Sequence, residues 1–298
     1  MSTDWQSRSE AGASFGLRLA AWIALTLGRP TLKFILYFIA FYFLLVRRSE
    51  RQASRKFLAR VTNKRVSILQ VYKHFLTFAQ VTADRIYFMV DRSDILPIHI
   101  NGAENANRFV RQGRGCVMLG SHLGNMEAAR DTARKDQGVD IRMVLDRAVS
   151  RELIKRLEAI NPDFARCLID AGQPAAQLGL SIGEALKQGD FVGFLGDRYR
   201  PGDRTVLCDF MGQPAKFPVG PLLIASVLRA PVVIVFSLYL KGAYEVICEP
   251  FSDAFHLPRD DREQALQESV QRYADRLALH AERAPYNWFN FYDFWAVD

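Results

Sequence analysis

The stretch Gly-Cys-Val-Met-Leu-Gly-Ser-His-Leu-Gly-Asn-Met-Glu, residues 115–127, indicates a buried strand, a sharp turn and the start of a helix. The apolar run Cys116–Leu119 ends in a glycine, as a buried strand does before a turn. Gly124 allows backbone conformations that other residues avoid, and Asn125 is a favoured N-cap residue. Strand, tight loop and helix in this order are typical of a sheet with helical crossovers.

Two residues of this stretch could do acid–base chemistry. His122 falls in the predicted loop, and Glu127 falls in the first helical turn, where the helix dipole favours a negative charge. Residues five apart on a regular helix do not face each other, so the two can pair only if the helix starts between them. A carboxylate beside a histidine fixes its tautomer and stabilises the imidazolium. We therefore predict His122 and Glu127 as a catalytic pair that activates an acceptor hydroxyl. The alternative is a loop histidine near an unrelated glutamate.

Gly-Ser-His-Leu-Gly-Asn-Met-Glu resembles the first block of the lysophospholipid acyltransferase superfamily, with its H-x-x-x-x-D/E signature. It is most similar to the branch of lipid A biosynthesis (lauroyl/myristoyl) acyltransferases, where the block reads H-x-G-N-x-E. Further blocks at 189–198 and 209–221 occur in the matching order and separation, so the resemblance covers roughly residues 15–295. The ending Tyr-Asn-Trp-Phe-Asn-Phe-Tyr-Asp-Phe-Trp, 286–295, differs from the usual lipid A enzyme ending. It is more similar to relatives that accompany fatty-acid-like or polyene biosynthesis.

The resemblance implies a membrane-associated acyltransferase. It would move a fatty acyl group from a thioester on acyl carrier protein, or on coenzyme A, to a hydroxyl or amine of a lipid or glycolipid. The thioester is a co-substrate, and no further cofactor is expected. Two alternatives remain open: transfer of an aminoacyl or other unusual acyl group from a dedicated carrier protein, and a membrane-tethered carrier-binding protein without catalysis.

From residue 97 onward, short apolar runs alternate with helical patterns, which predicts a mainly parallel sheet with helices on both faces. Two helices are also expected within residues 50–91. The expected strands are 97–101, 116–119, 141–145, 166–169, 191–195, 206–210, 232–240 and 244–249. The expected helices are 103–112, 125–136, 150–160, 175–188, 219–229 and 264–283.

In such a sheet, ligands bind beyond the carboxyl ends of the strands. His122 follows one predicted strand end and Asp197-Arg198 follows another, so we expect them to be neighbours. We predict that Arg198 binds an anionic group, either acceptor phosphate or the donor's phosphopantetheine. We predict that Asp197 orients Arg198 or a polar acceptor group.

Two further residues complete the predicted substrate-binding set. Asn125 stands at the helix start, and Lys216 is the nearest cation in the loop predicted at 212–221. Backbone N–H groups near Gly120 or at the Asn125 helix start are the expected donors to the oxyanion of the tetrahedral intermediate.

The net charge of +7 arises in the N-terminal region. Residues 1–65 hold twelve Lys/Arg against three Asp/Glu, and the remainder is slightly acidic. A basic cluster beside an apolar segment indicates anionic lipid, whereas nucleic-acid binding would need a basic face on the folded domain. We therefore predict anionic membrane lipids as a partner and no nucleic acid.

The apolar segment lies at 15–46, interrupted by Gly28-Arg29-Pro30. Its uninterrupted part, Phe34–Val46, would extend only about 20 Å as a helix, short of a hydrocarbon core of about 30 Å. It could form a helical hairpin in one leaflet, a single spanning helix or an amphipathic core helix. The positive-inside rule places the basic side, and the domain after it, at the cytoplasmic face of the inner membrane. We expect membrane-associating helices in 1–65 and the α/β acyltransferase domain in 66–298.

The four cysteines and the aromatic ending allow weaker predictions. The cysteines are scattered without C-x-x-C spacing, so we expect small buried side chains in a reducing compartment and no metal site. The aromatic residues of 288–295 could line an acyl-chain tunnel, face the membrane, or simply pack onto the core.

Overall fold

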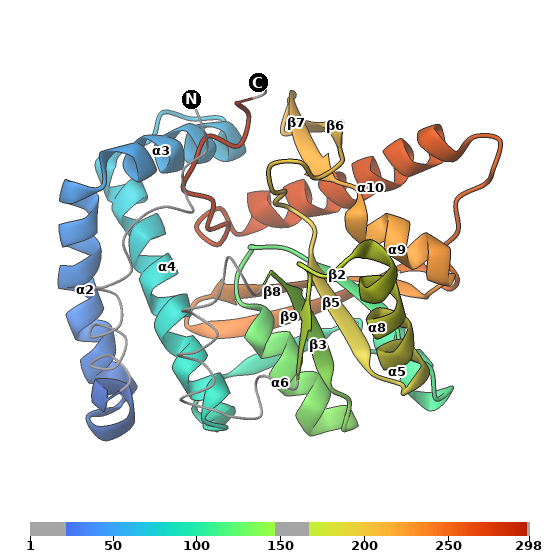
Figure 1. The fold of residues 1–298 in the computed structure, drawn as a ribbon. Helices are drawn as coiled ribbons and strands as arrows, with labels where there is room; N and C mark the ends of the chain where they lie inside the picture. Colours follow the sequence, from blue (N-terminus) through green and yellow to red (C-terminus); the bar gives the residue numbers. More distant parts are fainter. Residues whose placement is uncertain (1–21, 147–166, 297–298) are drawn as a thin grey trace.

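The computed structural model describes residues 22–146 and 167–296 (Figure 1). The strands are β1 (Ile98–Asn101), β2 (Val117–Gly120), β3 (Ile141–Leu145), β4 (Leu168–Asp170), β5 (Phe191–Leu195), β6 (Thr205–Phe210), β7 (Gln213–Pro218), β8 (Val232–Leu240) and β9 (Ala243–Ser252). Seven of them form a sheet in the order β1-β9-β8-β2-β5-β3-β4. Neighbouring strands run parallel except β8 and β9, which are antiparallel. The predicted mainly parallel α/β fold is therefore confirmed.

The helices agree with the predicted ones to within a few residues. They are α2 (Gly28–Val46), α3 (Arg48–Thr62), α4 (Ile68–Met89), α5 (Glu104–Arg111), α6 (Met126–Gln137), α8 (Ala175–Lys187), α9 (Gly220–Leu228) and α10 (Arg262–Arg283). The helix predicted at 150–160 lies outside the described residues. Local signals explain the boundaries. Ser67 and Gln70 form a capping box at the start of α4, and Gly138 ends α6 in the left-handed conformation.

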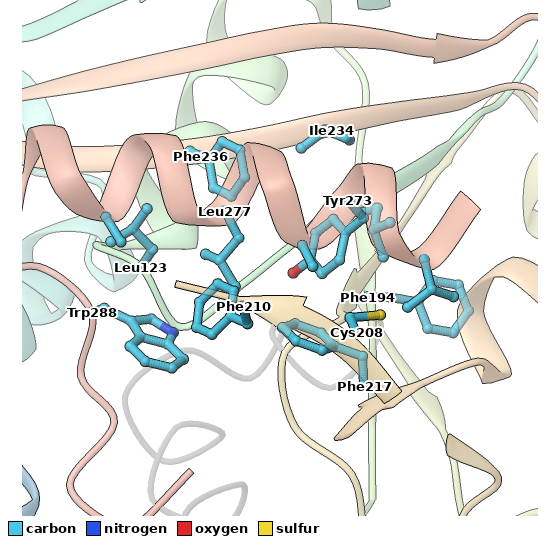
Figure 2. Close-up of a cluster of buried hydrophobic side chains, with 14 of the residues drawn as sticks. Leu123, Phe194, Cys208, Phe210, Phe217, Ile234, Phe236, Tyr273, Leu277 and Trp288 are labelled. Carbon is cyan, nitrogen blue, oxygen red and sulfur yellow. The ribbon is translucent and has the colours of Figure 1, made fainter. Parts of the chain in front are cut away.

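The central strands are buried on both faces, which is why they read as continuous apolar runs. Val117 and Leu119 of β2 point into one apolar cluster, with residues of α8, α9 and α10. Cys116 and Met118 point into a second cluster, with residues of α5 and α6. Figure 2 shows part of the first cluster, in which Leu277 of α10 lies among the aromatic side chains.

The prediction of a loop at 212–221 is wrong, because most of this segment is strand β7. It pairs antiparallel with β6 in a separate hairpin. Pro214 and Pro218 hid this strand, since proline is depleted from strands and is tolerated in edge positions. The alternation that marks a strand is nevertheless present. Ala215 and Phe217 are fully buried, and their sequence neighbours are more exposed.

The apolar helix α2 lies beside α4 at one side of the molecule (Figure 1). It begins at Gly28, so the predicted interruption near this position is confirmed. The buried side chains of α2 recur every four residues: Leu32, Leu36, Ala40 and Leu44. The first two join the second apolar cluster and the last two join the first, so this helix packs against both.

An ion pair fixes α2 to α4. The Arg29 guanidinium donates to both carboxylate oxygens of Asp84, at 2.9 and 2.7 Å, and Tyr244 of β9 donates its hydroxyl to the same carboxylate. Within the described residues, α2 is the one helix long and apolar enough to cross a membrane. The division of the chain into membrane-associating helices (1–65) and an acyltransferase domain (66–298) stays a prediction.

Candidate active site

The turn after β2 is held by backbone hydrogen bonds to three other parts of the chain. Gly196, just beyond β5, donates its N–H to Gly120 O at 2.9 Å. Gly124 donates to Asn287 O, and Asn125 donates to Ser237 O of β8, both at 2.9 Å. These hydrogen bonds tie the turn to β5, to β8 and to the segment after α10.

Gly124 cannot be replaced without moving this turn. Its φ is +79°, and an added Cβ would lie 1.8 Å from Ser237 O. We expect Gly124→Ala to lower the free energy of unfolding by about 3–5 kcal/mol, because both backbone strain and a clash with the main chain result. Denaturant unfolding followed by circular dichroism measures this loss.

Gly138→Ala is the matched control for that substitution. Gly138 also has a positive φ, +65°, but an added Cβ would meet nothing within 4 Å. The control should lose only about 1–2 kcal/mol, the cost of the left-handed conformation alone. Equal losses in the two variants would contradict the close approach at Gly124.

The partner of His122 is Asp197. The Nδ1–H of His122 donates to Asp197 Oδ1 at 2.8 Å, and the backbone N–H of His122 donates to both carboxylate oxygens at 3.1 and 3.0 Å. Asp197 is fully buried, whereas the His122 side chain is 25% exposed. Their expected proximity is confirmed. It follows from the pairing of β2 with β5, which places Gly120 opposite Leu195.

The expected pairing of His122 with Glu127 is wrong. Asn125 does cap α6 and Glu127 does lie in its first turn, as predicted. However, the Glu127 carboxylate accepts a hydrogen bond from Arg130 one turn further along the same helix, at 3.3 Å. The loop turns the histidine toward the end of β5, so the carboxylate that fixes its tautomer comes from the second sequence block. The catalytic role of Glu127 stays a prediction.

Electrostatics keep the two partners in the forms that a general base needs. Burial raises the pKa of Asp197, but His122, the Arg198 charge and a hydrogen bond from Trp288 outweigh this effect and lower it to about 2. Burial and the Arg198 charge lower the pKa of His122, against the opposing attraction of Asp197. The imidazole is therefore neutral at pH 7. With its proton on Nδ1, it presents the Nε2 lone pair.

Arg198 is fixed beside this pair. Its Nη2 donates to Phe289 O at 2.7 Å, and its guanidinium carbon lies 5.8 Å from the ring centre of Tyr292. Its Nε is buried and has no hydrogen-bond partner among the described residues. A cation held near the histidine, with donor capacity left over, suits an anionic substrate group. The hydrogen bonds of Asp197 go to His122 and Trp288 instead of Arg198.

The other two predicted substrate-binding residues have different surroundings. Asn125 is completely buried, where its side chain caps α6 and its Nδ2 lies 3.5 Å from Val81 O. Lys216 lies on β7, opposite Leu207 of β6. A contact with substrate stays a prediction for both residues.

Four backbone N–H groups of the turn, among those considered as donors to the oxyanion, are already engaged. The N–H groups of residues 122–125 donate in turn to Asp197, Ser121 Oγ, Asn287 O and Ser237 O. These four groups hold the conformation of the turn. An oxyanion contact with other backbone N–H groups near Gly120 or at the start of α6 stays a prediction.

Sequence reasoning missed two residues that support the site. Trp288 is fully buried, and its Nε1–H donates to Asp197 Oδ2 at 2.8 Å. Tyr273 of α10 donates its hydroxyl to Gly120 O at 2.7 Å. For Trp288, packing onto the core is the alternative that the structure confirms. A buried indole N–H usually finds an acceptor, but the sequence does not reveal which one.

The cysteines take no part in this arrangement. Cys116, Cys208 and Cys248 are buried, as predicted, whereas Cys167 is partly exposed. Burial raises the pKa of the three buried thiols, to about 12 for Cys208 and Cys248. Such thiols are poor nucleophiles at pH 7. Within residues 22–146 and 167–296, no three His, Cys, Asp or Glu side chains come together as metal ligands would.

The site combines a neutral imidazole with a free Nε2, a buried carboxylate that holds the ring, and a guanidinium beside it. This arrangement is typical of an α/β enzyme that transfers a group with the help of a general base. The family model of the bacterial lipid A biosynthesis acyltransferases matches residues 2–296, nearly the whole chain. The chain belongs to this family and is an acyltransferase, which confirms the resemblance found in its sequence. A search of curated proteins finds no match.

Proposed function

We propose that this acyltransferase moves a fatty acyl group from acyl carrier protein to a hydroxyl, or an amine, of a lipid or glycolipid at the cytoplasmic face of the inner membrane. The observation that carries the proposal is the His122 ring. Its Nδ1–H is bound to a buried carboxylate, and its Nε2 is free to accept a proton. Coenzyme A is the alternative carrier of the thioester.

The reaction follows from this arrangement. His122 Nε2 takes the proton of the acceptor hydroxyl as its oxygen attacks the thioester carbonyl carbon. The tetrahedral intermediate then breaks its C–S bond, and the leaving thiolate takes the proton from the imidazolium. Asp197 stays ionised throughout, since its pKa is about 2. It stabilises the positive charge on His122 while the intermediate exists.

Arg198 is a fixed cation beside His122 and is suited to bind negative charge. The backbone N–H groups of residues 122–125 are engaged, whereas its Nε is not. It would hold the phosphate of the acceptor or of the donor's phosphopantetheine. The same charge would stabilise an oxyanion formed next to His122.

Lipid mass spectrometry of cells with and without the protein tests the proposal. We expect one lipid species to be missing in cells without the protein. Its mass identifies both the acceptor and the acyl group. Purified protein should then make the same species from that acceptor and the fatty acyl-carrier thioester. A missing species with an aminoacyl or other unusual group would favour a dedicated carrier instead. No change in lipids, and no transfer from either donor, would contradict the proposal.

The exposed face of α2 supports membrane association. Opposite its buried side chains, Phe34, Phe38 and Phe41 are 64%, 63% and 54% exposed. The basic helix α3 follows directly, where anionic headgroups would lie. Because α2 is bound along α4, the arrangement favours a helix that lies in one leaflet on the domain surface over one that crosses the bilayer.

Replacing these three aromatic residues together should release the protein from membranes. Each aromatic side chain buried in the interface contributes about 1.5–3 kcal/mol, so Phe34→Ser, Phe38→Ser and Phe41→Ser should weaken binding at least 100-fold. Sedimentation with vesicles containing anionic lipid measures the bound fraction.

The matched control removes the same number of exposed apolar side chains elsewhere. Its substitutions are Leu180→Ser, Leu207→Ser and Val227→Ser, at positions 68%, 51% and 73% exposed. The control should sediment with vesicles like the wild type. Equal release of both triple variants would show that α2 is not the membrane-binding element.

A further inference from the structure

The segment that follows α10 contacts the site at three points. Phe289 donates its N–H to His122 O at 3.2 Å and accepts from Arg198 Nη2 at 2.7 Å. Trp288 donates its indole N–H to Asp197 Oδ2 at 2.8 Å. The three groups that the proposed reaction uses are therefore all joined to two consecutive residues that lie far from them in sequence.

Trp288 is itself held firmly. Its ring is fully buried, 5.0 Å from Phe57 and 5.3 Å from Phe210 between ring centres (Figure 2 shows the contact with Phe210). Its carbonyl oxygen accepts from His74 Nε2 at 3.0 Å, and the other ring nitrogen of His74 accepts from Ser54 Oγ at 2.8 Å. Burial lowers the pKa of His74 to about 4, so this support stays uncharged at neutral pH.

The two oxygens of Asp197 have different partners. Oδ1 accepts the Nδ1–H of His122, and Oδ2 accepts the indole N–H of Trp288, while the backbone N–H of His122 bridges both. The bridging N–H lies between the two oxygens and holds each at 3.0–3.1 Å, whereas the indole N–H gives Oδ2 a shorter hydrogen bond of its own, at 2.8 Å. The indole therefore strengthens the hold on the carboxylate plane, and with it the plane in which the imidazole must lie.

We propose that Trp288 is a positioning residue for acyl transfer: its indole N–H fixes Asp197 so that the carboxylate holds the His122 ring with Nε2 toward the substrate. The proposal rests on the proposed role of His122 as the base. The segment after α10 thus has two roles: it packs in the core, and through the indole N–H of Trp288 it positions the residues that carry out the reaction.

Removal of that N–H should be visible at His122. With one donor fewer, the Asp197 carboxylate attracts the imidazolium more strongly, so the pKa of His122 should rise by about 0.5–1 unit. The other charges that face the pair, Arg198 and Arg85 of α4, remain in place. Tyr273 and Tyr292 also face Asp197 and stay neutral, because burial raises the pKa of both hydroxyls.

The test compares Trp288→Phe with Trp295→Phe. Both changes delete an indole N–H from the same aromatic cluster, but the N–H of Trp295 donates to Phe210 O at 3.1 Å instead of to Asp197. The full chain is prepared in lipid nanodiscs with ring-labelled histidine, and each histidine is titrated by NMR. The chain has five histidines, and the His122 signal is the one lost in His122→Gln.

Trp288→Phe should raise the pKa of His122, move the acid limb of the kcat/KM profile with it and lower kcat by about 10–100-fold. Trp295→Phe should change none of these, although both variants can lower the melting temperature. Equal effects in the two variants, or a shifted pKa with unchanged transfer, would overturn the proposal. If Trp288→Phe does not fold, 3-benzothienylalanine at position 288 tests the same point, because it replaces the N–H with sulfur in the same shape.

The titration does not depend on the substrate. A wild-type protein that transfers nothing from either thioester refutes the proposed function. An active wild type whose His122 responds equally to both tryptophan changes refutes only the role of Trp288.

Discussion

His122→Gln is expected to reduce acyl transfer by about 10⁴-fold, the upper end of what loss of a general base costs. Glutamine occupies a similar volume and can still donate to Asp197, so the loop should keep its conformation. It has no group that accepts a proton near pH 7. Initial rates with the thioester donor and the lipid acceptor measure the loss, and circular dichroism checks the fold.

The control for this variant is His256→Gln, which changes an exposed histidine whose contact is with its own loop, at Ala254 O. It should transfer acyl groups at the wild-type rate. Full activity in His122→Gln, with the fold intact, would refute the assignment of this ring as the base.

Asp197→Asn should cost about 10³–10⁴-fold in kcat with little change in KM. The side chain keeps its shape and its contact with the Trp288 indole through the remaining oxygen. Its new amide, however, donates to the His122 ring and therefore favours the tautomer with the proton on Nε2. That ring cannot accept a proton from the substrate. Nitrogen NMR of the labelled ring reports the tautomer directly, and a rate assay reports its consequence.

Glu127→Gln separates the two carboxylates. The Glu127 carboxylate accepts a hydrogen bond from Arg130, and the His122 Nδ1–H is bound to Asp197, so the substitution should leave the tautomer of His122 as it is. This holds whatever Glu127 contributes to the rate. A tautomer change in Glu127→Gln, with none in Asp197→Asn, would show that the local H-x-x-x-x-E pair is the one that forms.

The sequence predicted the strand, turn and helix around His122 well, because each of them depends on local chemistry. The apolar run, Gly124 and Asn125 act through their own backbone conformations and nearest hydrogen bonds. The partner of His122 was misassigned for the opposite reason. Closeness in sequence, with the helix starting between the two residues, favoured Glu127, whereas Asp197 reaches the ring from the end of a neighbouring strand. The rule for strand ends placed Asp197 correctly near His122, but it could not say which of its neighbours the carboxylate would bind.

The role of Trp288 and the strand β7 were also not predicted from the sequence. Packing onto the core was one of three alternatives for the aromatic residues around Trp288, and the acceptor of an indole N–H depends on how segments 91 residues apart are packed. In β7, Pro214 and Pro218 masked an alternation that the hairpin with β6 makes clear. The acceptor of the indole N–H is decided by a tertiary contact without a local signal, whereas β7 has a local signal that its two prolines oppose.

The packing of α2 has a practical consequence for producing this enzyme free of lipid. Truncation before Arg48 would remove Leu32 and Leu36 from one apolar cluster and Ala40 and Leu44 from the other. The shortened chain would expose the apolar residues that these side chains now cover, and it would aggregate. Substitution of the outward aromatic residues keeps those four side chains in place. A detergent-free preparation for crystallisation should therefore be sought by substituting the exposed residues of α2 in the full-length chain.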